Sequence, residues 1–411
     1  MYGAIRDSSE REEEVMFFEK KNSLLDKKYP TYKDAEDTLW SALDVAKITP
    51  RIHDLTGEEG VWGLSGERLH AYEFTLGNPE APELIAVSNG QHGVERDAGL
   101  LFIAFVLHNK KHIERMLGND MRLLVADNLN PWGASAKTRV DHEGADPNRC
   151  YGKLAVGRTE LPPEYAILDP HMNFNNLTFG EVLKNLRHMW RHYRASGGEK
   201  LYKTIMRDGQ SVDPTRAQYV PPEPPWTVRT VRSIVGATLS ESHLKGLCHI
   251  DMHTALGPEY WRKHAEMLLI YQRDDPRFKQ ARFLWGDGVQ TTEAEDSISD
   301  SNLGTIEEVF EGDLPNRPQY IVSGCYERTT IGTVRAIMAG WLRHNVLRNR
   351  DNGGVFFDLY NQISLRAMGW GFYPPRKSWR RRSVAIMYHT LKRTIEGIKD
   401  GRKILHSLAK Q

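Results

Sequence analysis

The sequence predicts an α/β protein built on an open sheet. Short apolar runs of strand length recur along the chain, and each is followed by a polar turn and then by a stretch of helical length and apolar spacing. These runs lie at residues 84–87, 121–126, 247–253 and 319–327. Because an open α/β sheet binds its ligands beyond the carboxyl ends of its strands, the polar residues after each run are the candidates for chemistry.

Length, charge and cysteine content narrow the class of function. The chain has 411 residues and a formal net charge of +1, so it can bury a full core and gives no global reason to bind nucleic acid or an anionic membrane. Its three cysteines include no Cys-x-x-Cys pair, which argues against a disulfide framework and a thiolate zinc site. We expect a cytoplasmic protein that acts on a small molecule or a peptide, because the sequence shows neither a secretory signal nor a membrane span.

Three regions are expected along the chain. Residues 1–55 form an N-terminal helical extension, residues 56–350 a catalytic domain with an insertion around 152–235, and residues 351–411 a basic C-terminal helical extension. Residues 98–117 are apolar at helical spacing and predict one helix that covers the sheet. The basic run at 374–382 suits a face that is exposed to solvent or lies between subunits, so the protein could form a homo-oligomer. Contact with nucleic acid is the alternative.

The first candidate site is the turn that follows residues 84–87. His92 and Glu95 stand there, three positions apart, directly before the apolar run. An imidazole and a carboxylate at this spacing can reach one metal ion, with a third ligand supplied from far along the chain. For this pair taken alone, a solvated turn is the alternative.

The second candidate site is the polar loop after residues 121–126. The turn Asn130–Gly133 leads into Arg139, Asn148 and Arg149. A guanidinium beside an amide can hold a carboxylate through paired hydrogen bonds, so Asn148 and Arg149 suit a substrate anchor. A surface ion pair is the alternative.

The third candidate site lies in the run at 247–253. In a strand, the period of two places His249, Asp251 and His253 on one face. His253 ends the run, where it can face the same crevice as His92, and Asp251 could orient a ligand's ring by accepting its free N–H. A hydrogen-bonded strand with an exposed edge is the alternative.

The fourth candidate is Glu327, which ends the run at 319–327 before an amphipathic stretch at 331–347. Glu307 and Glu308 compete with it for the role of a general base. We favour Glu327 because a strand end followed by a helix is where this kind of sheet places its chemistry.

In this order the four motifs resemble those of the zinc carboxypeptidase superfamily, which holds carboxypeptidase A-like peptidases and the succinylglutamate desuccinylase and aspartoacylase enzymes. The resemblance is strongest to a little-characterised bacterial branch. Its motifs are similar to Gly-x-His-Gly-x-Glu, Asn-Pro-x-Gly, Asp-Leu-Asn-Arg, Asp-x-His-Thr-Gly-Leu-Gly and Glu-Phe-Gly-Thr. The matching segments here are Gly90–Glu95, Asn130–Gly133, Asp146–Arg149, Asp251–Gly257 and Glu327–Thr330.

The resemblance implies a fold and a mechanism. The fold would be a three-layer α/β/α arrangement with a mixed, mostly parallel twisted sheet, similar to phosphorylase/hydrolase-like proteins. One Zn²⁺ would be held by His92, Glu95 and His253, with Asp251 supporting His253. Glu327 would be the general base and Arg139 would stabilise the oxyanion.

The resemblance also implies the kind of substrate. Asn148 and Arg149 would hold a substrate carboxylate, and Arg328, which replaces a small or apolar neighbour of the base, could bind an anionic group. The scissile bond would be an amide, either at the carboxyl end of a peptide or in an N-acyl amino acid. Because Pro147 and Arg328 depart from the family pattern, a zinc-bearing binding protein without turnover is a further alternative.

Overall fold

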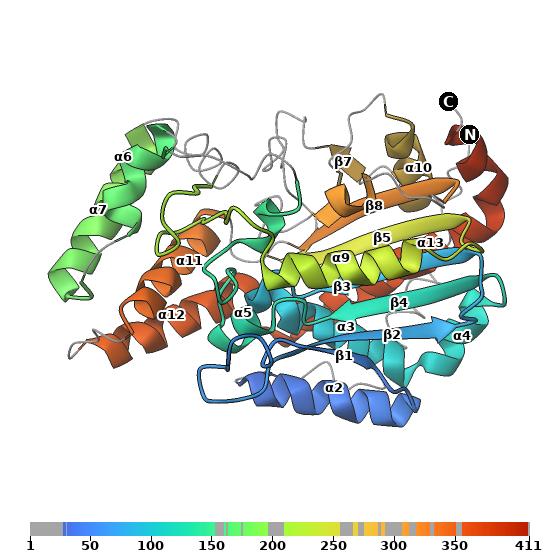
Figure 1. Cartoon of the computed structure of the whole chain (residues 1–411), viewed down its shortest axis with the longest axis horizontal. Helices are drawn as coiled ribbons and strands as arrows, with labels where there is room; N and C mark the ends of the chain where they lie inside the picture. Colours follow the sequence, from blue (N-terminus) through green and yellow to red (C-terminus); the bar gives the residue numbers. More distant parts are fainter. Residues whose placement is uncertain are drawn as a thin grey trace.

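The computed structural model places a mixed eight-stranded sheet at the centre of the molecule (Figure 1). The residues that it describes are 28–29, 31–152, 160–161, 163–173, 176–195, 209–254, 266–269, 275–286, 289–291, 306–311, 318–328, 333–350 and 356–409. The strands are β1 Arg51–Asp54, β2 His70–Gly77, β3 Glu83–Asn89, β4 Met121–Asp127, β5 Gly246–Thr254, β6 Glu266–Leu269, β7 Val289–Thr291 and β8 Tyr320–Arg328. Their order across the sheet is β1-β2-β4-β3-β5-β8-β6-β7.

The middle of this sheet is parallel and its flanks are antiparallel. Strands β4, β3, β5 and β8 run parallel to one another, whereas β2 pairs antiparallel with β4, and β6 pairs antiparallel with β8. Every residue of β4 and β5 is buried, as expected for strands covered on both faces. The predicted α/β class with a mixed, mostly parallel sheet is confirmed.

Helices cover both faces of the sheet and gather beyond one end of it (Figure 1). The helices are α2 Tyr32–Ala46, α3 Arg96–His108, α4 Lys110–Leu117, α5 Pro131–Ala136, α6 Pro163–Met172, α7 Phe179–Ala195, α9 Trp226–Leu239, α10 Pro276–Trp285, α11 Thr333–Arg348, α12 Phe357–Phe372 and α13 Lys377–Leu408. Three short 3₁₀ turns are η2 Gly93–Glu95, η3 Pro147–Arg149 and η5 Ile306–Glu311. Helix α9 packs over one face, and α2, α3 and α13 pack over the other.

The prediction of one helix over residues 98–117 is wrong. The segment forms α3 and α4, which are separated at Asn109. The Asn109 side chain donates to the Phe105 carbonyl at 2.8 Å and so caps the end of α3. Helix α3 is buried on nearly all sides because α2 and α13 pack on it from the side away from the sheet, which explains why its sequence is apolar all round.

Both ends of the chain contribute to the main core. Tyr29 and Leu39 from the N-terminal side and Leu391 and Ile398 from the C-terminal side belong to the same buried cluster as the strands. The expected boundaries near residues 55 and 350 therefore do not separate hydrophobic cores. The acidic composition of residues 287–303 predicts a flexible, lid-like loop, and apart from β7 this segment lies outside the described residues.

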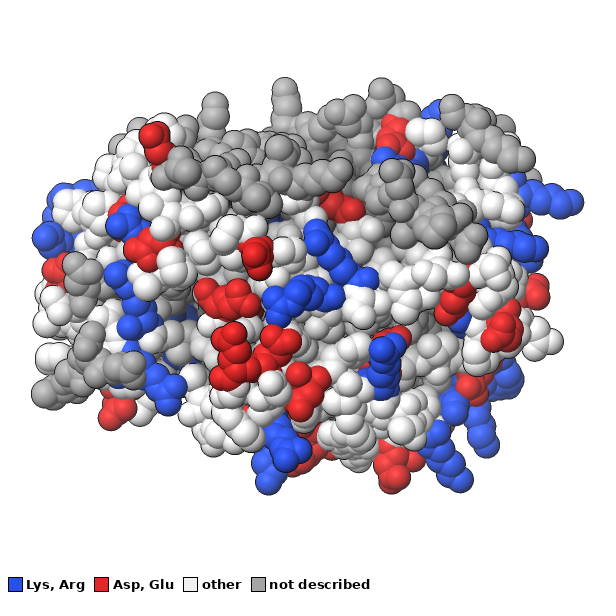
Figure 2. Space-filling model, in the orientation of Figure 1, with Lys and Arg blue, Asp and Glu red and all other residues white. Residues whose placement is uncertain are grey.

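The described surface agrees with the balanced composition. On the face shown in Figure 2, Lys and Arg side chains are scattered among Asp and Glu side chains. None of the described helices combines the length and the apolar character needed to cross a membrane. All three cysteines are described, and none of them forms a disulfide.

Candidate active site

The first candidate motif forms a tight turn at the carboxyl end of β3. Gly90 has φ of +76°, a conformation that side chains with a Cβ rarely adopt. Gly93 lies so close to α5 that an added Cβ would stand 2.0 Å from the Ala134 nitrogen. These two glycines let the chain turn from β3 into η2 and α3, and the turn brings His92 and Glu95 to the sheet end.

His92, Glu95 and His253 converge in the interior of the protein. His253 comes from the end of β5, the strand beside β3, and all three residues are buried. The Nδ1 atoms of the two histidines lie 3.1 Å apart, and each lies 3.1 Å from one carboxylate oxygen of Glu95. Within the described parts of the chain, this is the one group of three or more His, Cys, Asp or Glu residues whose donor atoms converge in this way.

Each histidine contacts the carboxylate of an aspartate through its Nε2 atom, on the side of the ring away from the donor group. The Nε2 atom of His253 lies 2.5 Å from Asp251 Oδ2, and the Nε2 atom of His92 lies 3.0 Å from Asp146 Oδ1. When both Nε2 atoms donate to these carboxylates, both Nδ1 lone pairs point toward each other and toward Glu95. Two such nitrogens cannot hydrogen-bond to each other, so the arrangement fits a divalent cation between them.

The charges around the three residues also suit a cation. Burial alone would raise the pKa of Glu95, but His92 and His253 beside it hold that pKa well below its usual range. Burial would likewise raise the pKa of Asp146, and His92 together with Arg139 keeps it low instead. The site therefore keeps its carboxylates ionised. Two imidazoles and a carboxylate suit Zn²⁺ and other divalent ions of similar preference.

Arg139 lies directly on this group. Its Nη1 donates to Glu95 Oε1 at 2.8 Å, and its Nη2 lies 2.9 Å from His92 Nε2 and 3.7 Å from Asp146 Oδ2. Its side chain is mostly buried, with 11% exposed. The guanidinium thus stands at the edge of the donor group, where it meets the metal-ligand candidates and not bulk solvent.

The expected substrate anchor lies in the same loop as Asp146. Asp146 Oδ1 accepts from the Asn148 nitrogen at 3.1 Å and so begins the η3 turn. Asn148 Oδ1 accepts from the Ile306 nitrogen at 3.2 Å, and Arg149 Nη1 donates to the Asn148 carbonyl at 2.6 Å. Arg149 is only 7% exposed, so the alternative of a surface ion pair is wrong.

Glu327 and Arg328 end strand β8. The register of the parallel pair β5–β8 sets Glu327 opposite His253 and Arg328 opposite Thr254. The backbone of the proposed base therefore lies beside that of a metal-ligand candidate. The side chains of both residues lie outside what the structure describes.

The structure adds one residue to the expected site and removes two alternatives. Sequence spacing gave no sign that Asp146 reaches His92, which is 54 positions earlier in the chain. Strand β5 lies between β3 and β8, so the alternative of an exposed strand edge for His249, Asp251 and His253 is wrong. His188 and His192 on α7 stand four positions apart, a spacing that metal ligands on a helix can have, but they belong to no convergent donor group among the described residues.

Comparison with solved structures gives matches of low sequence identity and low TM-score. One is a putative carboxypeptidase A from Shewanella denitrificans OS-217, with 12% identity and a TM-score of 0.40, which covers 89% of this chain and 69% of that one. Another is bovine thrombin-activatable fibrinolysis inhibitor in complex with tick carboxypeptidase inhibitor, with 10% identity and a TM-score of 0.41, which covers 90% of this chain and 99% of that one. A third is the succinylglutamate desuccinylase from Chromobacterium violaceum, with 12% identity and a TM-score of 0.34, which covers 85% and 75%.

The comparison by sequence gives a family without an assigned activity. No curated protein matches the chain. Residues 31–385 match the model of a family described as a protein of unknown function, DUF2817. Because this match spans most of the 411 residues, the protein belongs to the DUF2817 family.

Proposed function

We propose that the protein is a zinc-dependent hydrolase of amide bonds. The observation that carries the proposal is the buried convergence of His92, Glu95 and His253, with both Nδ1 atoms turned inward by Asp146 and Asp251. His92 Nδ1, His253 Nδ1 and the Glu95 carboxylate would hold the metal. Three protein ligands that leave a further position open are typical of a catalytic zinc site.

The residues around the ligands would supply the remaining chemistry. Bound zinc would polarise the substrate carbonyl and increase the acidity of a water molecule. Glu327 would accept the proton of that water and pass it to the leaving nitrogen, a role supported by its backbone position opposite His253. Arg139 would stabilise the developing oxyanion, which its place at the edge of the donor group supports.

The proposed substrate carries a carboxylate next to the scissile amide. Arg149 and Asn148 lie in the loop whose Asp146 orients His92. Arg328 follows the proposed base in β8, and its backbone is paired with that of Thr254, the residue after His253. A guanidinium beside an amide recognises a carboxylate by paired hydrogen bonds. A peptide with a free carboxyl end is the first candidate, and an N-acyl amino acid is the second.

The test compares metal content and hydrolysis in three variants. We expect one zinc per chain in the purified protein, loss of that zinc in His92→Ala, and lost hydrolysis at retained zinc in Glu327→Gln. His188→Ala, which alters a histidine on α7 outside the donor group, is the control and keeps both zinc and turnover. Peptides with free and with amidated carboxyl ends, run beside N-acyl amino acids, identify the substrate class.

Two results would contradict the proposal in different ways. A purified protein that takes up no stoichiometric metal would rule out the metal site itself. Stoichiometric zinc with no product in any of the three substrate sets would favour the alternative of a zinc-bearing binding protein.

A further inference from the structure

A chain of buried polar side chains continues from the metal site into the sheet. Asp251 holds His253 with Oδ2, and its other oxygen, Oδ1, accepts from Ser88 Oγ at 2.5 Å. Ser88 Oγ lies 2.8 Å from His249 Nε2, and His249 Nδ1 lies 2.7 Å from Ser323 Oγ. Every member is buried, from Ser323 at 0% exposed to Ser88 at 4%.

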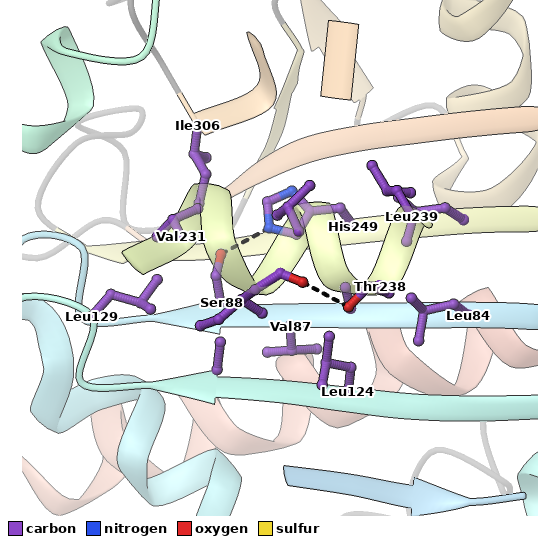
Figure 3. A pocket seen from close by; sticks show the side chains of 15 residues that line it. Leu84, Val87, Ser88, Leu124, Leu129, Val231, Thr238, Leu239, His249 and Ile306 are labelled. Carbon is purple, nitrogen blue, oxygen red and sulfur yellow. Dashed lines mark hydrogen bonds between the residues drawn. The ribbon is translucent and has the colours of Figure 1, made fainter. Parts of the chain in front are cut away.

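The register of three strands builds this chain. Ser88 in β3 pairs with Asp251 in β5, and His249 in β5 pairs with Ser323 in β8. Residues paired in parallel strands present their side chains to the same face of a sheet, so the polar groups form one row across the strands. Figure 3 shows Ser88 and His249 turned toward each other, among apolar side chains from α9 and the strands that line a cavity.

The hydrogen bonds in the row have a fixed direction. A carboxylate can only accept, so the single hydroxyl proton of Ser88 goes to Asp251. Ser88 Oγ must then accept from His249, which makes Nε2 the protonated nitrogen of that ring. Burial lowers the pKa of His249 to about 4, so the ring is neutral near pH 7 and its Nδ1 accepts from Ser323. All the bonds therefore run from Ser323 toward Asp251.

The same direction determines which nitrogen of His253 is available. Asp251 has its Oδ1 occupied by Ser88, and it takes the Nε2 proton of His253 on Oδ2. The row is fully satisfied only when His253 carries a proton on Nε2, and in the neutral ring this leaves Nδ1 as the lone pair. Because a buried hydroxyl or imidazole without a hydrogen-bond partner is destabilising, the row favours this tautomer of the neutral ring over the other.

We propose that Ser88 and His249 are positioning residues of the metal site, which hold Asp251 so that His253 presents Nδ1 to the ion. The inference rests on the proposed zinc function. Neither residue belongs to the donor group, and both act through Asp251. Second-sphere partners of metal ligands commonly change metal affinity about 10- to 100-fold, so a residue one step further out is expected to act at the lower end of that range.

The test measures zinc affinity in matched variants of the full chain. In Ser88→Ala the hydroxyl is lost, and we expect the zinc dissociation constant, from chelator competition, to rise about tenfold. Ser88→Thr keeps the hydroxyl at a position that lines a cavity, so it should restore an affinity near that of the wild type. Thr238→Val is the control, because Thr238 lines the same cavity but its hydroxyl proton goes to the Ile234 carbonyl of its own helix.

A second variant and a second measurement distinguish a loss of zinc affinity caused by misfolding from one caused by a misplaced Asp251. His249→Phe keeps a ring of similar size and removes both hydrogen bonds, and it should also raise the dissociation constant. The midpoint of thermal unfolding of the metal-free protein, measured for each variant, reports any general loss of stability.

Three outcomes would overturn the inference. Wild-type zinc affinity in both Ser88→Ala and His249→Phe would show that the row has no effect on the ligand. An equal loss of affinity in Thr238→Val would assign the effect to the cavity and not to the row. No zinc uptake by the wild-type protein would remove the proposed function together with this inference, whereas the first two outcomes leave the function intact.

Discussion

At the scale of single residues, the site is built from histidines that are each oriented by a buried carboxylate. Asp146 serves His92 and Asp251 serves His253, although the two aspartates come from a loop and from a strand. Both carboxylates leave Nδ1 for the cation, so the two rings are oriented in an equivalent way, although only His92 also contacts Arg139. This equivalence is visible only in the structure, since the sequence pairs Asp251 with His253 but places Asp146 far from His92.

Asp141 in the same loop carries the first prediction at this scale. Its Oδ1 accepts from the Glu143 and Ala145 nitrogens, at 3.0 and 2.9 Å, and Oδ2 has no hydrogen-bond partner among the described residues. Burial raises the pKa of Asp141 to about 8, so the group is neutral in the folded protein near pH 7. An asparagine side chain at this position would be close in shape to the neutral acid and would keep the same acceptor oxygen.

The expected result of Asp141→Asn is a difference that depends on pH. An aspartate in the unfolded chain has a pKa of about 3.9, so the folded state binds the extra proton between about pH 4 and pH 8. The contribution of Asp141 to wild-type stability therefore falls as pH rises through this window. The Asp141→Asn variant has no titratable group at this position, so it does not lose stability in this way as pH rises. Its unfolding midpoint relative to the wild type should therefore rise from pH 4 to pH 8 and level off above, as thermal melts at a series of pH values would show. A difference that does not change with pH would contradict the raised pKa.

At the scale of elements, the first two motifs form one interlocked unit. Helix α5 begins at Asn130, whose side chain accepts from the Gly133 nitrogen at 2.8 Å, and Pro131 takes the first helical position. The backbone of α5 then lies against Gly93 in η2, and the Val94 nitrogen donates to the Thr138 carbonyl at 3.0 Å. The turn Asn130–Gly133 thus supports the ligand turn from outside, which gives this motif a structural role that does not involve the substrate.

Gly93→Ala tests this contact between elements. The added Cβ would meet backbone atoms of Gly133 and Ala134 at 2.0 to 2.6 Å, so η2 or α5 must move and the geometry of His92 and Glu95 must change with it. We expect zinc affinity to fall at least about tenfold, as for a disturbed ligand sphere, without any ligand being altered. Gly236→Ala in α9 is the control, because its Cβ would meet no described atom within 4 Å, and it should keep zinc affinity and gain up to about 1 kcal/mol of stability. Equal zinc affinity in both variants would contradict the role of the close contact.

At the scale of the whole molecule, the C-terminal helix is joined to the sheet at the end opposite the site. Glu83 at the start of β3 is fully buried, with Oε2 accepting from the Tyr320 hydroxyl at 2.6 Å and Oε1 paired with Arg402 of α13 at 3.0 Å. Residues separated by hundreds of positions therefore meet at one carboxylate. The contact adds a buried hydrogen bond and an ion pair to the apolar packing of α13 on α3 and the sheet.

Tyr320→Phe tests how much the hydrogen bond between Tyr320 and Glu83 contributes to stability. The change leaves Glu83 Oε2 buried without its donor, and an unsatisfied buried group costs about 1–3 kcal/mol. Urea unfolding should show a loss of that size in the free energy of unfolding, with zinc affinity unchanged because the site lies at the other end of the strands. Glu83→Gln, which removes the buried charge and keeps an acceptor for Tyr320, should cost less. A larger loss for Glu83→Gln than for Tyr320→Phe would contradict the account.

The sequence by itself determined the strands that carry the site and the residues that the structure brings together as a candidate metal group. It could do so because an apolar run followed by a polar turn encodes a strand and its end locally, and because imidazoles and carboxylates are the donors that such a site needs. The tertiary structure alone decided that Asp146 backs His92, that residues 96–117 break into two helices, and that α13 belongs to the core. These features depend on contacts between distant segments, such as the 161 positions that separate His92 from His253, and local spacing carries no information about which atoms meet when strands pair and helices pack.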